Sequence, residues 1–204
     1  MNLRFPQRDE IREIASKPVM AVDLGFGAHK SCGLAWQTPS GERQVKVMNF
    51  GRCVEHIAEF ISENHDSALS VEAPLSGLFG SSGNPKGRTQ FERTRVAGRT
   101  VTRYWYVGAG AAVGLGATFL FSQLPQRVLS ESNVVSVVEG FISFKTRRSN
   151  HKEDALTLLK GLRNPDARFY DVDADAGERC VNVLSLVGLV PREAPCPAVM
   201  VVTV

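Results

Sequence analysis

Apolar runs near the N-terminus predict three consecutive strands. Residues 18–24 (PVMAVDL) form a nearly unbroken apolar run, as expected of a strand that is covered on both faces. Residues 31–37 (SCGLAWQ) and 44–50 (QVKVMNF) also have strand character, and the turn-forming segment 39–41 (PSG) separates them. The three strands are therefore predicted to form an antiparallel meander.

Helical and strand patterns alternate after residue 50. Residues 54–64 and 150–162 place apolar side chains at helical spacing opposite charged ones, so both are predicted to be amphipathic helices. Residues 68–73 and 133–144 are rich in apolar and β-branched residues and are predicted to be strands. The second of these strands is interrupted by the Glu139-Gly140 pair.

A long insertion and a tail surround this regular part. Within the insertion at about residues 75–130, the Gly-, Ser- and Arg-rich first part up to Arg103 predicts an irregular surface segment, and residues 104–121 predict a helix. In the tail, residues 180–190 predict a helix and residues 198–204 a strand. Three strands followed by alternating helices and strands predict an α/β fold, a mixed sheet with helices on both faces.

Composition and charge narrow the class of protein. The 204 residues fit one domain that spans the whole chain, and 43% hydrophobic with 22% charged residues excludes a disordered or collagen-like protein. The net charge of +3 is too small to demand a polyanionic partner by itself. The segment 104–121 lacks formal charges, but its glycines fit a buried helix, so we expect no association with a membrane.

The four cysteines lie far apart in the sequence and form no CxxC pair. This spacing argues against a zinc ribbon and against a dense disulfide framework. No apolar stretch of signal-peptide length occurs in residues 1–17. We therefore expect a cytoplasmic protein with free thiols.

Carboxylates stand at the ends of three apolar runs. Asp23 ends VMAVD, Glu72 ends ALSVE and Glu139 ends VVSVVE. If the first and fourth strands are parallel neighbours about 4.8 Å apart, Asp23 and Glu72 meet at one sheet edge and repel unless they share a cation. Oxygen ligands favour Mg²⁺ or Mn²⁺, and two such ions about 4 Å apart promote hydrolysis of phosphodiesters. Taken alone, an acid at a strand end is more often a solvated loop residue or a helix cap.

The predicted helix at 150–162 contributes two more candidates. His151 and Asp154 are three residues apart and therefore lie on one helix face, about 5–6 Å apart at their Cβ atoms. Asp154 would complete the carboxylate set as a metal ligand, and His151 would orient or deprotonate an attacking water. The pair also fits a solvated first helical turn. Glu139 is a fourth possible metal ligand, with pairing to Arg147 or Arg148 as the alternative.

These motifs, taken in order, resemble a known superfamily. Asp23 in VMAVDLGFG, Glu72 in SVEAPL and His151 with Asp154 in HKEDA are similar to the RNase H-like superfamily over about residues 18–163. The spacing resembles RuvC-type nucleases and a family of predicted RNase H-like nucleases of undefined role. The resemblance implies a five-stranded mixed sheet, with Asp23 bridging two metal ions and Glu72 and Asp154 as further ligands. The insertion at about 75–130 departs from the family pattern.

The insertion carries a basic segment. Residues 86–103 hold six cations against the single acid Glu92, and arginine suits the phosphate backbone of DNA or RNA. Three aromatic residues at 104–106 follow and offer faces for stacking with unpaired bases. A solvated basic loop with anchoring aromatics is the alternative. The predicted nucleic-acid contacts are Arg88, Arg95, Arg99, Arg103 and Lys152.

The sequence thus favours a metal-dependent nuclease with Mg²⁺ or Mn²⁺ as cofactor, nucleic acid as partner and, by analogy, a possible homodimer. A non-catalytic nucleic-acid-binding module is one alternative. A sugar-kinase or actin-like phosphotransfer protein is another, because DLGFGAHK also resembles the phosphate-binding hairpin of that superfamily. The length of 204 residues argues against the two lobes that such proteins need.

Overall fold

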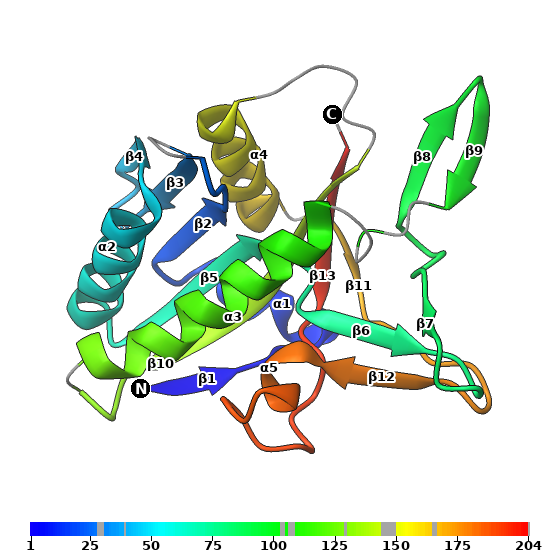
Figure 1. The fold of residues 1–204 in the computed structure, drawn as a ribbon. Coiled ribbons are helices and arrows are strands. Elements are labelled where there is room, and N and C mark those ends of the chain that lie inside the picture. Colours follow the sequence, from blue (N-terminus) through cyan, green and yellow to red (C-terminus); the bar gives the residue numbers. More distant parts are fainter. Residues whose placement is uncertain are drawn as a thin grey trace.

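A mixed eight-stranded sheet forms the centre of the molecule (Figure 1). The computed structural model describes residues 1–27, 31–38, 40–102, 105, 109–128, 130–143, 150–164 and 167–203, and of residues 94–96, 102 and 109 it describes only the backbone. The strand order is β11-β13-β10-β5-β2-β3-β4, with β1 pairing to β10. The strands of this sheet are β1 (Asn2–Arg4), β2 (Val19–Asp23), β3 (Cys32–Gln37), β4 (Arg43–Met48), β5 (Asp66–Glu72), β10 (Val134–Ser143), β11 (Arg168–Tyr170) and β13 (Val199–Thr203).

The predicted strand directions are confirmed. Strands β2, β3 and β4 form an antiparallel meander, and β5 and β10 continue the sheet in parallel from β2. The sheet is wider than the predicted five strands, because β13, β11 and β1 extend it beyond β10. Strand β10 also runs through the Glu139-Gly140 pair without the predicted interruption, since both residues pair in register with β13.

Helices cover both faces of the sheet, as predicted. On one face, α2 (Phe50–Glu63) and α3 (Ala109–Arg127) pack on the side of β2 that presents Met20 and Val22. On the other face, α1 (Ile11–Ile14) and α4 (His151–Arg163) pack on alternate β2 residues, Val19 and Ala21. Side chains alternate along a strand, so a shift of one residue moves a side chain from one helical layer to the other.

The first part of the insertion is more regular than predicted. Strands β6 (Ser76–Phe79) and β7 (Pro85–Lys86) join β12 (Arg179–Asn182) in a three-stranded sheet. Strands β8 (Arg93–Val96) and β9 (Arg99–Thr102) form a hairpin that projects from the body of the molecule (Figure 1). A two-residue turn with positive φ at both positions closes the hairpin. The Gly-, Asn- and Pro-rich composition of the insertion did not by itself predict this hairpin.

The apolar segment after the hairpin forms a helix, as predicted, but α3 ends later, at Arg127. No helix within the described ranges is long and apolar enough to cross a membrane. In the tail, the predicted helix at 180–190 is wrong, because β12 occupies its start and only the short α5 (Val183–Leu186) follows. The strand predicted at 198–204 is confirmed as β13.

Candidate metal centre

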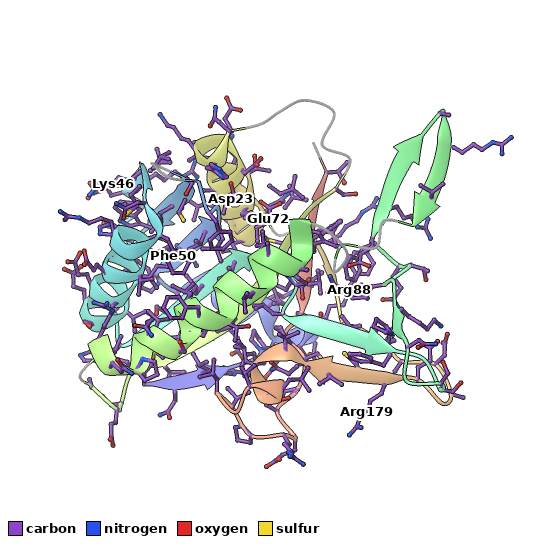
Figure 2. The ribbon with its side chains drawn as sticks, in the orientation of Figure 1. Asp23, Lys46, Phe50, Glu72, Arg88 and Arg179 are labelled. Atoms are coloured by element: carbon purple, nitrogen blue, oxygen red, sulfur yellow. The ribbon has the colours of Figure 1, made fainter. Side chains whose placement is uncertain are left out.

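Asp23 and Glu72 meet at one edge of the sheet. Strands β2 and β5 are parallel neighbours, and their register pairs Asp23 with Glu72. Both acids lie on the face that packs under α4, because Asp23 alternates with Val19 and Ala21. Figure 2 shows the two acids close to each other beside α4, apart from Arg88. The sheet topology therefore creates the pair that the sequence predicts.

Helix α4 adds the third carboxylate. Asn150 caps this helix by accepting a hydrogen bond from the backbone N–H of Glu153 at 3.0 Å, which fixes where the first turn begins. Asp154 then falls on the buried side of the helix, next to Ala155. One carboxylate oxygen from each of Asp23, Glu72 and Asp154 lies within 4.8 Å of the others. Residues separated by more than a hundred positions in the sequence thus form one cluster.

A glycine allows α4 to approach this closely. Gly33 pairs with Asp23 across β2 and β3 and lies beneath the first turn of α4. A Cβ atom at Gly33 would lie 1.8 Å from the His151 carbonyl oxygen, far inside van der Waals contact. A side chain at position 33 would therefore push the helix start, and with it the metal cluster, away from the sheet.

His151 binds one member of the cluster directly. Its Nδ1 lies 2.5 Å from Asp23 Oδ2. The Asp23 side chain is 9% exposed, whereas the His151 side chain is 41% exposed. The imidazole therefore connects the buried carboxylates to solvent, and it orients Asp23 within the cluster.

The donor chemistry of the cluster fits a hard divalent cation. Three ionised carboxylates repel each other, by about 3.5 kcal/mol for a pair of charges 4.8 Å apart at an effective dielectric constant of about 20. Mg²⁺ and Mn²⁺ prefer oxygen ligands, and the described ligand atoms of this cluster are all oxygens. The three acids could therefore hold a metal ion, with His151 supporting Asp23 from the outside.

The prediction that Glu139 is a metal ligand is wrong. Glu139 pairs in register with Val71, the neighbour of Glu72, so its side chain lies on the opposite face of the sheet. Both of its oxygens are occupied by protein donors. Oε2 accepts hydrogen bonds from the backbone of Leu75 and Ser76 and from the Ser76 hydroxyl, and Oε1 accepts one from Arg88 at 2.6 Å.

Arg88 has a structural role in place of the predicted contact with nucleic acid. Its side chain is fully buried, and its guanidinium binds Glu92 at 2.8 Å and Glu139 at 2.6 Å. Burial raises the pKa of Glu92 above its usual value, although the bonds from Arg88 oppose this shift. Because both Arg88 and the pair of acids are buried, this network is a part of the interior and does not face a ligand.

The other predicted contacts with nucleic acid lie on the surface or outside the described residues. Arg99 is exposed in the β8–β9 hairpin, and Lys152 is exposed in the first turn of α4. Arg95 lies in β8, but its side chain is outside the described part of the chain, as is all of Arg103.

Of the three aromatic residues predicted to stack on bases, Tyr104 and Tyr106 lie outside the described residues. Trp105 is buried and packs edge-on against Phe141, with 5.0 Å between the ring centroids. Trp105 therefore anchors this segment to the interior, which is the alternative role stated above for the three aromatic residues.

Two structural features were not predicted, although the sequence contains a pattern that is typical of each. An isolated glycine inside the strand pattern SCGLAWQ is typical of a close backbone approach, and Gly33 is that residue. Arg88 and Glu92 are four residues apart with opposite charges, which is typical of a pair within one turn of chain. Neither pattern indicates its partner from another element.

A scan against models of protein families found no match, and neither did searches of curated proteins and of solved structures. The function of this chain therefore has to be inferred from the geometry of the site.

Proposed function

We propose that this protein is a Mg²⁺- or Mn²⁺-dependent nuclease of RNase H-like type that hydrolyses phosphodiester bonds in DNA or RNA. The observation that carries the proposal is the convergence of Asp23, Glu72 and Asp154 within 4.8 Å of one another, from two parallel strands and a helix. The central strands β4-β3-β2-β5-β10, three antiparallel strands followed by parallel ones, agree with the mixed sheet that the resemblance implies.

In this proposal the chain's own groups have distinct tasks. Divalent ions, when bound, supply Lewis acidity and lower the pKa of water, which provides a nucleophile at neutral pH. Asp23, Glu72 and Asp154 hold the ions with carboxylate oxygens. His151 positions Asp23 through Nδ1, and its exposed ring can exchange a proton with water through Nε2.

Basic groups on the surface would bind the phosphate backbone. Lys152 stands next to His151 at the start of α4, within one turn of the metal cluster. The β8–β9 hairpin carries exposed Arg93 and Arg99 on an arm that projects from the body (Figure 1). Guanidinium groups on such an arm suit phosphates of a long polymer better than a small substrate.

The cellular setting and the assembly follow as parts of the same proposal. The four cysteines are free thiols, which fits the reducing cytoplasm. A homodimer stays a prediction by analogy with junction-cleaving nucleases.

The proposal is tested by cleavage assays on labelled single-stranded DNA, duplex DNA, RNA and RNA–DNA hybrids with Mg²⁺, Mn²⁺ or EDTA. We expect metal-dependent cleavage of at least one substrate, and a loss of about 10³-fold or more in Asp154→Asn. Glu153→Gln is the matched control, because Glu153 is the exposed neighbour in the same helical turn. Cleavage that persists in EDTA, or equal cleavage by Asp154→Asn, contradicts the proposal.

A further inference from the structure

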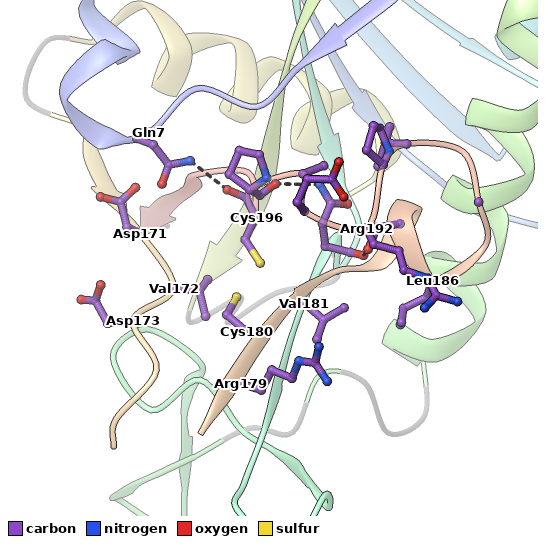
Figure 3. Close-up of a pocket in the computed structure, with 18 residues that line it drawn as sticks. Gln7, Asp171, Val172, Asp173, Arg179, Cys180, Val181, Leu186, Arg192 and Cys196 are labelled. Atoms are coloured by element: carbon purple, nitrogen blue, oxygen red, sulfur yellow. Dashed lines mark hydrogen bonds between the residues drawn. The ribbon is translucent and has the colours of Figure 1, made fainter. Parts of the chain in front are cut away.

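Two cysteines line a large surface cavity beside β12, and none of the three acids of the metal cluster lines it (Figure 3). Cys180 lies in β12, and Cys196 lies in the segment that leads into β13. Their thiols hydrogen-bond to each other, and Figure 3 shows the two sulfur atoms facing each other. Both residues are only partly buried, so a small molecule can reach them from the cavity.

The protein holds the two sulfurs in this arrangement from both sides. Gln7 donates a hydrogen bond to the Cys196 carbonyl at 3.1 Å, and Asn182 donates one to the Pro195 carbonyl at 2.7 Å. On the other side, β12 pairs with β6, with Cys180 opposite Leu78. The proximity of the two thiols is therefore a property of the fold and does not depend on a free loop.

The two thiols differ in their chemistry. The hydrogen bond from Cys196 lowers the pKa of Cys180, burial opposes this shift, and the charges of Arg88 and Glu139 act on it in opposite directions. The same hydrogen bond and burial raise the pKa of Cys196. The Cys180 thiol therefore ionises more readily than the Cys196 thiol, which favours Cys180 as the nucleophile of the pair.

The cavity has the size and polarity of a binding site for a small charged molecule. Its volume of about 980 Å³ lies at the upper end of the range of ligand pockets, about 300–1,000 Å³. Charges of both signs line it, which suits a molecule that carries ammonium and carboxylate groups together. The charged lining residues are Asp171, Asp173, Arg179, Arg192 and Glu193.

We propose that Cys180 and Cys196 are a redox-active dithiol that a low-molecular-weight disulfide of the glutathione type, which carries both ammonium and carboxylate groups, converts reversibly into an intramolecular disulfide. The Cys180 thiolate attacks one sulfur of the small disulfide, which forms a mixed disulfide and releases one small thiolate. That thiolate takes the proton from Cys196. The Cys196 thiolate then attacks Sγ of Cys180 and releases the second small thiolate, which takes a proton from solvent.

This reaction balances as one protein dithiol and one small disulfide giving one protein disulfide and two small thiols. The chain contains its own control in a second pair of thiols that hydrogen-bond to each other, Cys32 and Cys53. Both are completely buried between the sheet and α2, where a small disulfide cannot enter. The proposed oxidation therefore depends on access through the cavity and not only on the proximity of two thiols.

The test treats the reduced full chain with oxidised glutathione, blocks remaining thiols with N-ethylmaleimide and maps tryptic peptides by mass spectrometry. We expect peptides 180–192 and 193–204 to be joined by a disulfide, and Cys32 and Cys53 to stay reduced. We expect dithiothreitol to reverse the link. No link between the two peptides, or equally fast oxidation of Cys32 with Cys53, overturns the proposal.

Two variants test the order of attack. Cys196→Ser removes the resolving thiol, so a mixed disulfide should accumulate on Cys180. Cys180→Ser leaves only Cys196, whose pKa burial still raises, so we expect its adduct to form about tenfold more slowly. Equal rates of adduct formation in the two variants overturn the assignment of Cys180 as the nucleophile. None of these results depends on nuclease activity, so the proposed function can fail independently.

Discussion

Two carboxylate clusters lie on opposite faces of the same sheet, and they differ in the groups that they bind. On the α4 face, Asp23, Glu72 and Asp154 converge on one another. On the other face, Glu139 and Glu92 converge on the guanidinium of Arg88. Both clusters are buried, and each contains an acid that ends an apolar run of the sequence, so neither burial nor that sequence pattern tells them apart.

The partners of each cluster make the difference. Glu139 receives three hydrogen bonds from Leu75 and Ser76 in addition to Arg88, so the protein itself satisfies its charge. The α4 face instead brings three acids together, with His151 bound to one of them. A buried arginine that binds both acids makes the first cluster structural, and three carboxylate oxygens within 4.8 Å of one another make the second a candidate for a metal ion.

The largest expected effect separates the two clusters by activity. Glu72→Gln removes one metal ligand, so we expect phosphodiester cleavage to fall by about 10³-fold or more. Without metal, its free energy of unfolding should stay equal or rise, because the repulsion between the carboxylates falls. Glu139→Gln should instead lower the free energy of unfolding by about 2–4 kcal/mol and leave the midpoint of a Mn²⁺ titration unchanged. The measurements are cleavage rates, urea unfolding and metal titration of both variants. The reverse pattern would invalidate the assignment of roles.

The second effect concerns the structural cluster alone. Arg88→Met leaves Glu92 and Glu139 buried without their cation, so we expect a loss of about 3–5 kcal/mol in the free energy of unfolding. Arg99→Met, on the exposed hairpin, is the matched control and should change stability by about 0.5 kcal/mol or less. Urea denaturation measures both. A loss below about 1 kcal/mol in Arg88→Met would show that the network does not hold the interior together.

A third effect tests how the metal cluster is positioned. Gly33→Ala places a Cβ against the His151 backbone, so we expect a loss of about 1–3 kcal/mol in stability and weaker binding of Mn²⁺. Gly27→Ala is the control, because its nearest neighbour would lie at 3.4 Å, an ordinary contact distance. Thermal unfolding with and without Mn²⁺ reports both quantities. Unchanged Mn²⁺ binding in Gly33→Ala would mean that α4 does not depend on this contact.

The smallest effect is a dependence on pH. Burial raises the folded-state pKa of Glu92, so the folded protein binds a proton at pH values where the unfolded chain does not. The Glu92 carboxyl therefore makes the free energy of unfolding rise as the pH falls from 7 toward the usual pKa of a glutamate. Relative to Glu92→Gln, the wild-type protein should gain stability between pH 7 and pH 5 in urea denaturation. A relative loss over this range would contradict the direction of the shift.

Much of the metal cluster follows from the sequence, because local rules determine it. Apolar runs predicted β2 and β5, their parallel pairing predicted the meeting of Asp23 and Glu72, and the spacing in HKEDA predicted that His151 and Asp154 share a helix face. The strand and helix patterns operate within a few residues, whereas the pairing of β2 with the distant β5 entered the prediction as a condition.

The incorrect predictions needed information that local patterns do not carry. Glu139 ends an apolar run just as Glu72 does, but the register of β10 against β5 moves it by one residue and therefore to the other face. Arg88 belongs to a strongly basic segment, yet two acids from different elements hold it in the interior. The three-stranded sheet of the insertion depends on pairing with the distant β12, which composition does not indicate.

The central claim is that the three acids on the α4 face form a site for divalent ions. Crystals soaked in MnCl₂ test it through anomalous scattering at the manganese edge. The account predicts a peak about 2.0–2.2 Å from carboxylate oxygens of Asp23, Glu72 and Asp154, and none beside Glu139. A crystal that shows no peak between these three carboxylates at millimolar Mn²⁺, or that shows its only peak elsewhere, contradicts the claim.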